Sequence, residues 1–170
     1  IEDATKKYTG QVVRLSLLSA QYKQPLDWNN DLLMEQSKTL DKWYSMYSSE
    51  VSEKTPDCFN DLLDDMNTPL YISKLHELFQ QSQNGNKDKK KEFNKACRLI
   101  GLFNESAEKR AEYKKSKAKI SEDNILSRIK DREEAKKTGN YKLADQIRDD
   151  LNKEGIDIKD EKGKTTWNYK

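Results

Sequence analysis

Apolar residues recur at steps of three and four through most of the first hundred residues, and this spacing constrains the fold more than any other feature. Such residues lie on one face of an α-helix, whereas a half-buried strand alternates apolar and polar residues. Short loops separate the periodic stretches, which indicates an antiparallel bundle of about five helices. The helices are expected at residues 3–20, 30–51, 56–66, 68–82 and 88–100.

Proline and capping residues set the expected helix boundaries. Pro25 follows the first helix and cannot continue it. Asn30 is expected to cap the second helix. Thr68 is expected to cap the fourth, because Pro69 suits the first helical position.

The second helix carries a heptad-like seam of Leu33, Leu40 and Tyr47 that interleaves with further residues. Such a seam predicts lengthwise packing against another helix. It also motivates a helical structural or protein-interaction module with no RNA role, which is the alternative to the RNA-binding function considered below. Concentration-dependent assembly without RNA affinity would favour that alternative.

The composition fits an elongated helical protein. Hydrophobic residues make up 34% of the chain, below the usual 45–50% or so of globular proteins. The 3 Trp, 8 Tyr and 4 Phe residues argue against a disordered chain. Cys58 and Cys97 are interpreted as reduced, buried thiols of a cytoplasmic protein, with a disulfide as the open alternative.

Targeting signals are not evident in this sequence. No apolar run approaches the roughly 20 residues that span a bilayer, so no membrane role is expected. The start, Ile1-Glu2-Asp3, has neither a signal-peptide pattern nor an initiator methionine. The chain is therefore expected to be part of a longer protein.

Charge is distributed unevenly along the chain. Residues 1–86 carry 8 basic and 13 acidic side chains, a net charge of −5. Residues 87–119 carry 12 basic and 5 acidic side chains, a net charge of +7, and residues 120–170 carry 12 of each. A polyanion is therefore expected to meet the middle and end of the chain, although lysine runs also occur as solvated faces.

The polar, lysine-rich residues 104–121 are interpreted as a linker, with an extended helix as the alternative. After this linker, two helices are expected between Ser121 and Gly139 and between Asn140 and Gly155, because each pair supplies an N-terminal cap and a C-terminal glycine. Residues 156–167 then predict a β-hairpin that packs on these helices. The predicted class is mostly α, with a small α+β C-terminal domain.

Catalytic constellations are scarce. His76 is the one histidine of the chain and has no cysteine partner at metal-ligand spacing, so it is interpreted as a helix-surface residue. The adjacent Asp64 and Asp65 do not share a helix face, which argues against a paired acid/base site or a hydrolase built on them. One of them is expected to accept backbone N–H bonds near the corner at residues 67–69.

The C-terminal part is richer in side chains that suit single-stranded RNA. Flat rings stack on bases, whereas carboxylates and guanidinium groups bind base edges. A purely structural interpretation stays open, in which Trp167 packs the hairpin and Asp145 pairs with Arg148 as a surface ion pair. The candidate residues are Lys136, Tyr141, Asp145, Arg148, Asp160 and Trp167.

Three stretches, in order along the chain, resemble the cysteinyl-tRNA synthetases. The most extensive runs from Ala135 to Trp167 and reads Ala144-Asp145-x-Ile147-Arg148-x-x-Leu151, Gly155-Ile156 and Ile158-x-Asp160-x-x-Gly163-x-Thr165-x-Trp167. The others are Arg14-x-x-Leu17-Leu18-Ser19-x-x-Tyr22-x-x-Pro25-Leu26 and Asp64-Asp65-Met66-Asn67-Thr68-Pro69. The resemblance covers nearly the whole chain.

The resemblance implies a part of a class I enzyme that activates cysteine with ATP and transfers it to its tRNA. The family's ATP signatures and its zinc site lie in a catalytic domain that is not in this sequence, so this chain is expected to hold no catalytic site, cofactor or metal. The chain is expected to begin just after the second signature. Residues 1–103 would be a tRNA-contacting helical bundle, and residues 122–170 would be the domain that reads the GCA anticodon of tRNA(Cys).

The resemblance also implies residue roles. The family's anticodon contacts fall on Lys136, Tyr141, Asp145, Asp160 and Trp167. The family more often has Arg at position 136, and lysine lacks the planar fork that binds a guanine edge, so a phosphate contact is expected there. Position 141 is more often Phe or Trp, and Tyr141 keeps the stacking face.

Overall fold

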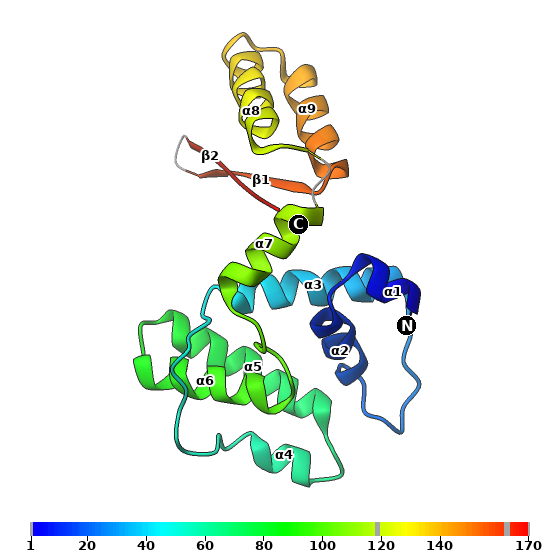
Figure 1. Cartoon of the computed structure of the whole chain (residues 1–170), viewed down its shortest axis with the longest axis vertical. Helices are drawn as coiled ribbons and strands as arrows, with labels where there is room; N and C mark the ends of the chain where they lie inside the picture. Colours follow the sequence, from blue (N-terminus) through cyan, green and yellow to red (C-terminus); the bar gives the residue numbers. More distant parts are fainter. Residues whose placement is uncertain (1, 118–119, 162–163, 170) are drawn as a thin grey trace. The chain divides into compact units, whose positions relative to one another are not determined.

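The computed structural model describes residues 2–117, 120–161 and 164–169. The chain divides into two compact units, Ile1–Ala107 and Glu108–Lys170, here called the N-terminal and C-terminal units. The described residues are mostly helical and end in a two-stranded antiparallel sheet (Figure 1). This arrangement confirms the predicted class. Among the described residues, no helix is both long and apolar enough to cross a membrane.

The N-terminal unit is a helical bundle. Helices α5 and α6 lie side by side and antiparallel (Figure 1), and α2 packs against α3. The short α4 packs against α5. The helices are α1 (Glu2–Lys7), α2 (Gly10–Leu18), α3 (Asn30–Tyr44), α4 (Phe59–Leu63), α5 (Thr68–Gln83) and α6 (Lys87–Leu99).

The single helix expected at residues 3–20 is wrong, because the chain forms two helices there. Thr9 adopts an extended backbone and caps α2, its hydroxyl accepting a hydrogen bond from the Val12 N–H at 3.4 Å. A capping threonine interrupts the helix that the apolar spacing would otherwise continue. The second expected cap is displaced by one residue, since Asn29, not Asn30, accepts from the Leu32 N–H at 2.8 Å.

The predicted seam is shorter than expected. Leu33 and Leu40 are buried, but α3 ends at Tyr44, so Tyr47 lies beyond the helix. The cap at the start of α5 also differs from the prediction. Asn67 accepts from the Leu70 N–H at 3.2 Å, while Thr68 is the first helical residue.

The core of the N-terminal unit is aromatic and aliphatic. Trp43 and Phe93 meet edge to face with ring centroids 5.7 Å apart, and Leu75 is fully buried with them. Cys58 and Cys97 are buried and free, as predicted. Burial raises the pKa of both thiols, which keeps them protonated.

The C-terminal unit contains a pair of long helices and a hairpin. The two helices lie side by side, and the first strand of the hairpin packs against the second helix (Figure 1). Helix α7 occupies most of the stretch that was interpreted as a linker at residues 104–121. The elements are α7 (Ala107–Lys117), α8 (Glu122–Lys137), α9 (Tyr141–Lys153), β1 (Ile156–Glu161) and β2 (Lys164–Tyr169).

Local sequence explains the boundaries of these helices. Gly139 and Gly155 have φ values of 75° and 89°, the left-handed region that follows a helix end. Asn140 caps α9 as predicted, accepting from the Leu143 N–H at 3.3 Å. Ser121 occupies the cap position of α8, but its side chain makes no capping hydrogen bond.

The hairpin presents one face to the helices. Ile156 and Ile158 on β1 are buried in a small core with Ile125, Ile129 and Leu151. Ile158 pairs with Trp167 across the strands, and Asp160 pairs with Thr165, so these four side chains share that inner face. Asp160 and Glu161 still belong to β1, and residues 162–163, which follow them, lie outside the described residues. The inner face thus leads from an apolar core to a charged end.

Candidate nucleic-acid interface

The charged end of the inner face is built around the Asp160 carboxylate. Arg132 on α8 donates two parallel hydrogen bonds to it, Nη1 to Oδ1 at 3.0 Å and Nη2 to Oδ2 at 2.9 Å. Lys136 Nζ donates to Oδ2 at 2.7 Å, and the Thr165 hydroxyl donates to Oδ1 at 3.0 Å. The geometry is the bidentate arginine–carboxylate pair, joined by a lysine one helical turn away.

Arg132 was not among the predicted site residues, although it is the principal partner of Asp160. Its side chain is only 3% exposed. The sequence did contain a signal, because Arg132 continues the inward-facing spacing of Ile125 and Ile129 along α8. A charged side chain at a core position requires a partner of opposite charge.

These contacts determine the charge of the cluster. The Arg132 guanidinium, followed by Lys136 and then Thr165, holds the pKa of the Asp160 carboxyl well below its usual range, although burial opposes the shift. Asp160 in turn raises the pKa of Arg132, and the negative charge of Asp145 adds to that effect. Asp160 is therefore an ionised hydrogen-bond acceptor at neutral pH.

The two predicted stacking rings have different surroundings. Tyr141 is the first residue of α9 and is 66% exposed. Trp167 is partly buried, packs against the core of the C-terminal unit and meets Tyr169 edge to face at 5.2 Å. Tyr141 is thus an open stacking surface, whereas Trp167 also supports the hairpin.

Asp145 and Arg148 lie on α9 and are both exposed. The surface ion pair that was left open as an alternative is absent, since neither side chain has an ion pair in the part of the chain that the structure describes. Asp145 follows Tyr141 by one helical turn, so the ring and the carboxylate share a face.

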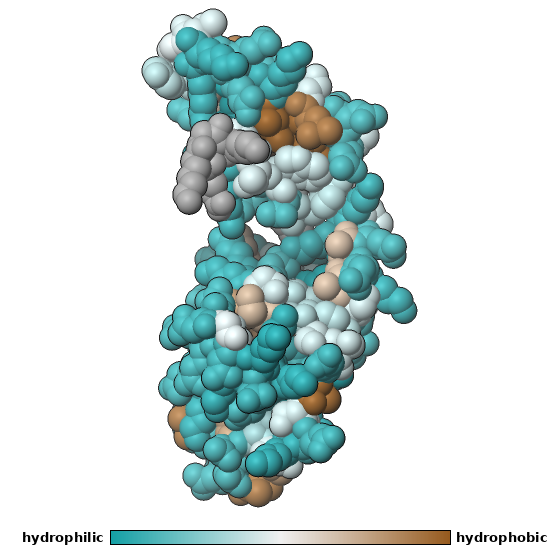
Figure 2. All heavy atoms as spheres, turned by 90° about the vertical axis from the view of Figure 1, so that its left-hand side faces the viewer, coloured by the Kyte–Doolittle hydropathy of each residue, from teal (hydrophilic) through white to brown (hydrophobic). Residues whose placement is uncertain are grey.

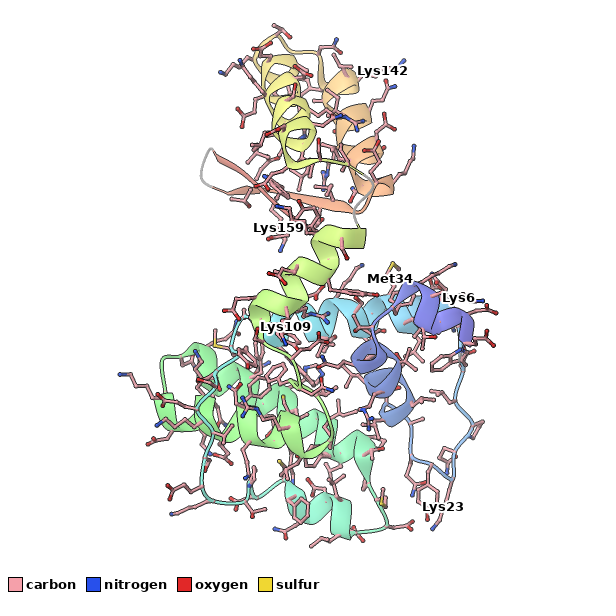
Figure 3. All side chains as sticks on the ribbon, in the orientation of Figure 1. Lys6, Lys23, Met34, Lys109, Lys142 and Lys159 are labelled. Atoms are coloured by element: carbon pink, nitrogen blue, oxygen red, sulfur yellow. The ribbon has the colours of Figure 1, made fainter. Side chains whose placement is uncertain are left out.

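Two further lysines lie on elements that carry candidate residues. Figure 3 shows Lys142 at the start of α9 and Lys159 on β1, both at the outside of the unit. Hydrophilic residues cover most of the face that Figure 2 shows, with hydrophobic residues confined to small patches. Such a surface suits a solvated, charged ligand better than an apolar one.

The Asp64-Asp65 corner differs from its predicted role. The Asp65 carboxylate accepts hydrogen bonds from the side chains of Gln21, Tyr22 and Lys23, the last at 2.6 Å. The expected backbone donor, the Asn67 N–H, bonds to Asp64 at 3.2 Å, but it does so at the backbone carbonyl oxygen and not at a carboxylate. Asp65 and Met66 both have φ of 51°, a backbone turn that aims Asp65 at the loop after α2. The corner therefore has a structural role, because Asp65 holds the loop after α2 in place.

The described residues contain no group of three or more His, Cys, Asp or Glu side chains that could hold a metal ion. His76 is exposed and meets Trp43 edge to face at 5.0 Å. Its pKa is lowered by partial burial and by Lys42.

Comparison with known proteins finds a family model that matches part of the C-terminal unit. Residues 127–167 match the family model described as the cysteinyl-tRNA ligase anticodon binding domain. This stretch contains the cluster of Arg132, Lys136 and Asp160 and the exposed face of α9. Residues 127–167 are thus similar to the anticodon-binding domain of cysteinyl-tRNA ligases.

Relatives that align with nearly the whole chain are cysteine–tRNA ligases. The chain is 44% identical, over its full length, to the cysteine–tRNA ligase of Pelagibacter ubique (strain HTCC1062), and covers 38% of that protein. It is 35% identical over 95% of its length to the enzyme of Rickettsia bellii (strain OSU 85-389), covering 36%. It is 31% identical over 98% of its length to that of Afipia carboxidovorans, again covering 36%. The chain is related along its length to cysteine–tRNA ligases, which confirms the resemblance.

Proposed function

We propose that this chain binds tRNA(Cys), reads its GCA anticodon with the C-terminal unit, and positions the tRNA for aminoacylation by a catalytic domain outside this chain. The N-terminal helical bundle contacts the inside of the tRNA L. The match of residues 127–167 to an anticodon-binding domain carries the proposal. Binding energy gained far from the reacting ends then appears as specificity of charging.

The site chemistry supports this role. Tyr141 offers an exposed ring on which a base stacks, and Asp145, one turn later, offers a carboxylate to base amino or imino groups. Arg148 on the same helix and Lys136 on α8 supply positive charge for phosphates. Asp160 is a second ionised acceptor, and Trp167 supports the strand opposite it.

The proposed reaction assigns ATP and zinc to the longer enzyme. The chain spans less than two-fifths of the length of the curated relatives described above. ATP activates cysteine and zinc binds the cysteine thiol in the catalytic domain, as the family resemblance implies. We expect the enzyme to work in the cytoplasm, where its tRNA is charged.

A binding assay tests the proposal. The chain is titrated with a tRNA transcript that has a GCA anticodon and with the same transcript after all three anticodon bases are changed, at two salt concentrations. We expect a clear preference for GCA and weaker binding at the higher salt concentration. Equal affinity for both transcripts would leave only a general basic surface and would contradict anticodon reading.

Single substitutions then locate the contacts. Asp145→Ala and Asp160→Ala are each expected to weaken binding of the GCA transcript by about 1–3 kcal/mol, the usual scale for a lost base contact. Asp157→Ala is the matched control, because Asp157 lies on β1 between inward-facing residues and so points to the outer face of the hairpin. Unchanged affinity in both test variants would remove these residues from the site.

The alternative, a helical interaction module, loses its motivating feature in the structure. Leu33 and Leu40, which suggested a seam for partner helices, are 5% and 0% exposed within the core of the N-terminal unit itself. A side chain that is buried inside its own unit is not available to a partner helix.

A further inference from the structure

Asp160 has no acceptor capacity left in the free protein. A carboxylate offers about four lone-pair positions, two on each oxygen. Oδ1 accepts from Arg132 and Thr165, and Oδ2 accepts from Arg132 and Lys136, so four donors fill them. A base donor therefore binds Asp160 only if one of these donors leaves.

The four hydrogen bonds differ in how readily they are given up. Arg132 is 3% exposed, and Asp160 is the only hydrogen-bond partner of its guanidinium among the described residues. Its departure would leave a buried charge without a partner, at high cost. Thr165 is tied to Asp160 by the strand pairing itself.

Lys136 is the donor that can leave. Its side chain is 37% exposed, it makes a single hydrogen bond to Asp160, and it lies in the last turn of α8. A lysine ammonium on a flexible stem re-forms its hydrogen bonds with water or phosphate at little cost. The partner carboxylate is itself 46% exposed, so a ligand can reach the position that Lys136 vacates.

We propose that Lys136 occupies, in the free protein, the position on Asp160 Oδ2 that a base N–H donor takes in the RNA complex, while Arg132 holds the carboxylate in place. This inference rests on the proposed function. Arg132 is a positioning residue in this scheme, since it acts on RNA only through Asp160. Lys136 moves from the carboxylate to the phosphate backbone, so its positive charge stays at the interface.

The exchange makes Asp160 selective. A base that presents an N–H donor to Oδ2 replaces the hydrogen bond that Lys136 gave up. A base that presents a carbonyl or ring nitrogen acceptor does not replace it, and it places a lone pair against an ionised oxygen. Lys136 therefore occupies Asp160 Oδ2 unless a base edge with an N–H donor displaces it.

Nuclear magnetic resonance of the full 170-residue chain with labelled lysine tests the exchange. The Lys136 signal is assigned as the one lost in Lys136→Arg, and Asp160→Asn shows its position without the ion pair. On addition of a GCA anticodon stem-loop, the Lys136 signal should leave its ion-paired position, while the Lys159 signal on β1 serves as a reference for general effects. A Lys136 signal that stays ion-paired to Asp160 at saturation would overturn the inference.

The same titration separates this inference from the proposed function. Signals of Tyr141 and of the Trp167 indole report whether the stem-loop binds the C-terminal unit at all. Movement of these signals with Lys136 unchanged would leave anticodon binding intact and would overturn only the exchange. If none of them moved, both proposals would fail.

A double-mutant cycle gives an independent measure. Lys136→Met in the Asp160→Asn background removes only a phosphate contact, and we expect about a tenfold loss of stem-loop affinity, near the scale of one charge-assisted contact. In the chain with Asp160 intact, Lys136→Met also removes the Lys136–Asp160 ion pair that RNA binding would otherwise have to break. This gain offsets part of the lost phosphate contact, so the loss of affinity should be about threefold or less. Equal losses in the two backgrounds would contradict displacement of Lys136.

Conservative substitution tests the positioning role of Arg132. Arg132→Lys keeps the charge but not the planar fork. We expect it to reduce the preference for GCA over the changed anticodon while the salt dependence of binding is retained, and Arg132→Met to abolish the preference. Melting temperatures of the free variants show whether each one folds. A folded Arg132→Met with full preference would overturn this role.

Discussion

The N-terminal and C-terminal units differ in what fills their interiors. The N-terminal unit buries large rings and aliphatic side chains, including Trp43, Tyr71, Phe93 and Leu75, each no more than 1% exposed. The C-terminal unit has a core of five aliphatic residues and, at its edge, the fully charged pair of Arg132 and Asp160. One unit relies on apolar burial, and the other combines a small core with an ion pair.

This difference follows from unit size. A domain of about 60 residues buries a smaller fraction of its surface than a domain of 100 and is correspondingly less stable. The C-terminal unit, with residues 108–170, is in that range. It nevertheless places a charged cluster where an apolar contact would stabilise it more, which is typical of a surface kept for binding.

The largest expected effect on stability comes from replacing one buried leucine by alanine in the core of each unit. Leu75→Ala and Leu151→Ala each remove a fully buried leucine, and we expect each to lower the free energy of unfolding by about 2–5 kcal/mol. That loss should unfold the small C-terminal unit at room temperature but leave the N-terminal unit largely folded. Urea unfolding followed through the indole signals of Trp43 and Trp167 reports each unit separately.

Leu63→Ala is the control for these deletions, because Leu63 is 70% exposed and its removal should change stability by less than about 0.5 kcal/mol. If Leu151→Ala left the Trp167 signal folded, the inference that the C-terminal core is marginal would be wrong. If Leu75→Ala unfolded both units together, the units would not be independent.

The ion pair gives the next effect, with a defined pH dependence. The folded pKa of Asp160 is depressed, so the pair stabilises the C-terminal unit fully above the unfolded pKa of about 3.9. The contribution declines as pH falls through the folded pKa. We expect Asp160→Asn to lower the free energy of unfolding by about 1–2 kcal/mol at pH 7, because the Asp160 carboxylate is 46% exposed and solvent screens its charge, although Arg132 is buried.

Urea unfolding of the parent and of Asp160→Asn at pH 7, 5 and 3 measures this dependence. The difference between the two proteins should be constant at pH 7 and 5 and smaller at pH 3. Asp157→Asn, on the outer face of β1, should show no such dependence. A parent–variant difference that grew on acidification would have the wrong sign for a depressed pKa.

The smallest expected effect on stability comes from removing one helix cap in each unit, which compares the two units directly. Thr9 caps α2 in the N-terminal unit, and Asn140 caps α9 in the C-terminal unit. Thr9→Ala and Asn140→Ala should each cost about 1 kcal/mol. The melting temperature of the smaller unit should fall further for the same loss, because its unfolding entropy is smaller. Equal shifts in the two thermal melts would argue against the size explanation.

Much of the fold could be predicted because its signals are local. Asn140, Gly139 and Gly155 fix helix ends through their own backbone preferences, and the structure confirms them. The break at Thr9 was missed because apolar spacing continues across it, and only the cap geometry interrupts the helix. The seam was overextended for a similar reason, since Tyr47 keeps the spacing although α3 has already ended.

The candidate site was predicted in a different way, by family motif. Lys136 and Asp160 are separated by 24 residues, and nothing in their spacing says that their atoms lie 2.7 Å apart. The structure brings them together because Ile158 of β1 shares a core with Ile125 and Ile129 of α8, so that Asp160, two residues further along the strand, meets the later part of that helix. It also adds Arg132, which the motif did not single out. The roles of the six predicted residues toward RNA stay predictions.

The sequence by itself determined the mostly helical class, the Asn140 cap with the glycines at residues 139 and 155, the hairpin and the family resemblance, because helical spacing, glycine and asparagine backbone preferences and ordered motifs are properties of neighbouring residues. Only the tertiary structure decided which donors fill the Asp160 carboxylate, that Arg132 is buried beneath it, and that Lys136 is the exposed one. These facts depend on how α8 packs against the hairpin. The donors to the Asp160 carboxylate come from both α8 and β2, so neither segment alone shows how many of its acceptor positions are filled.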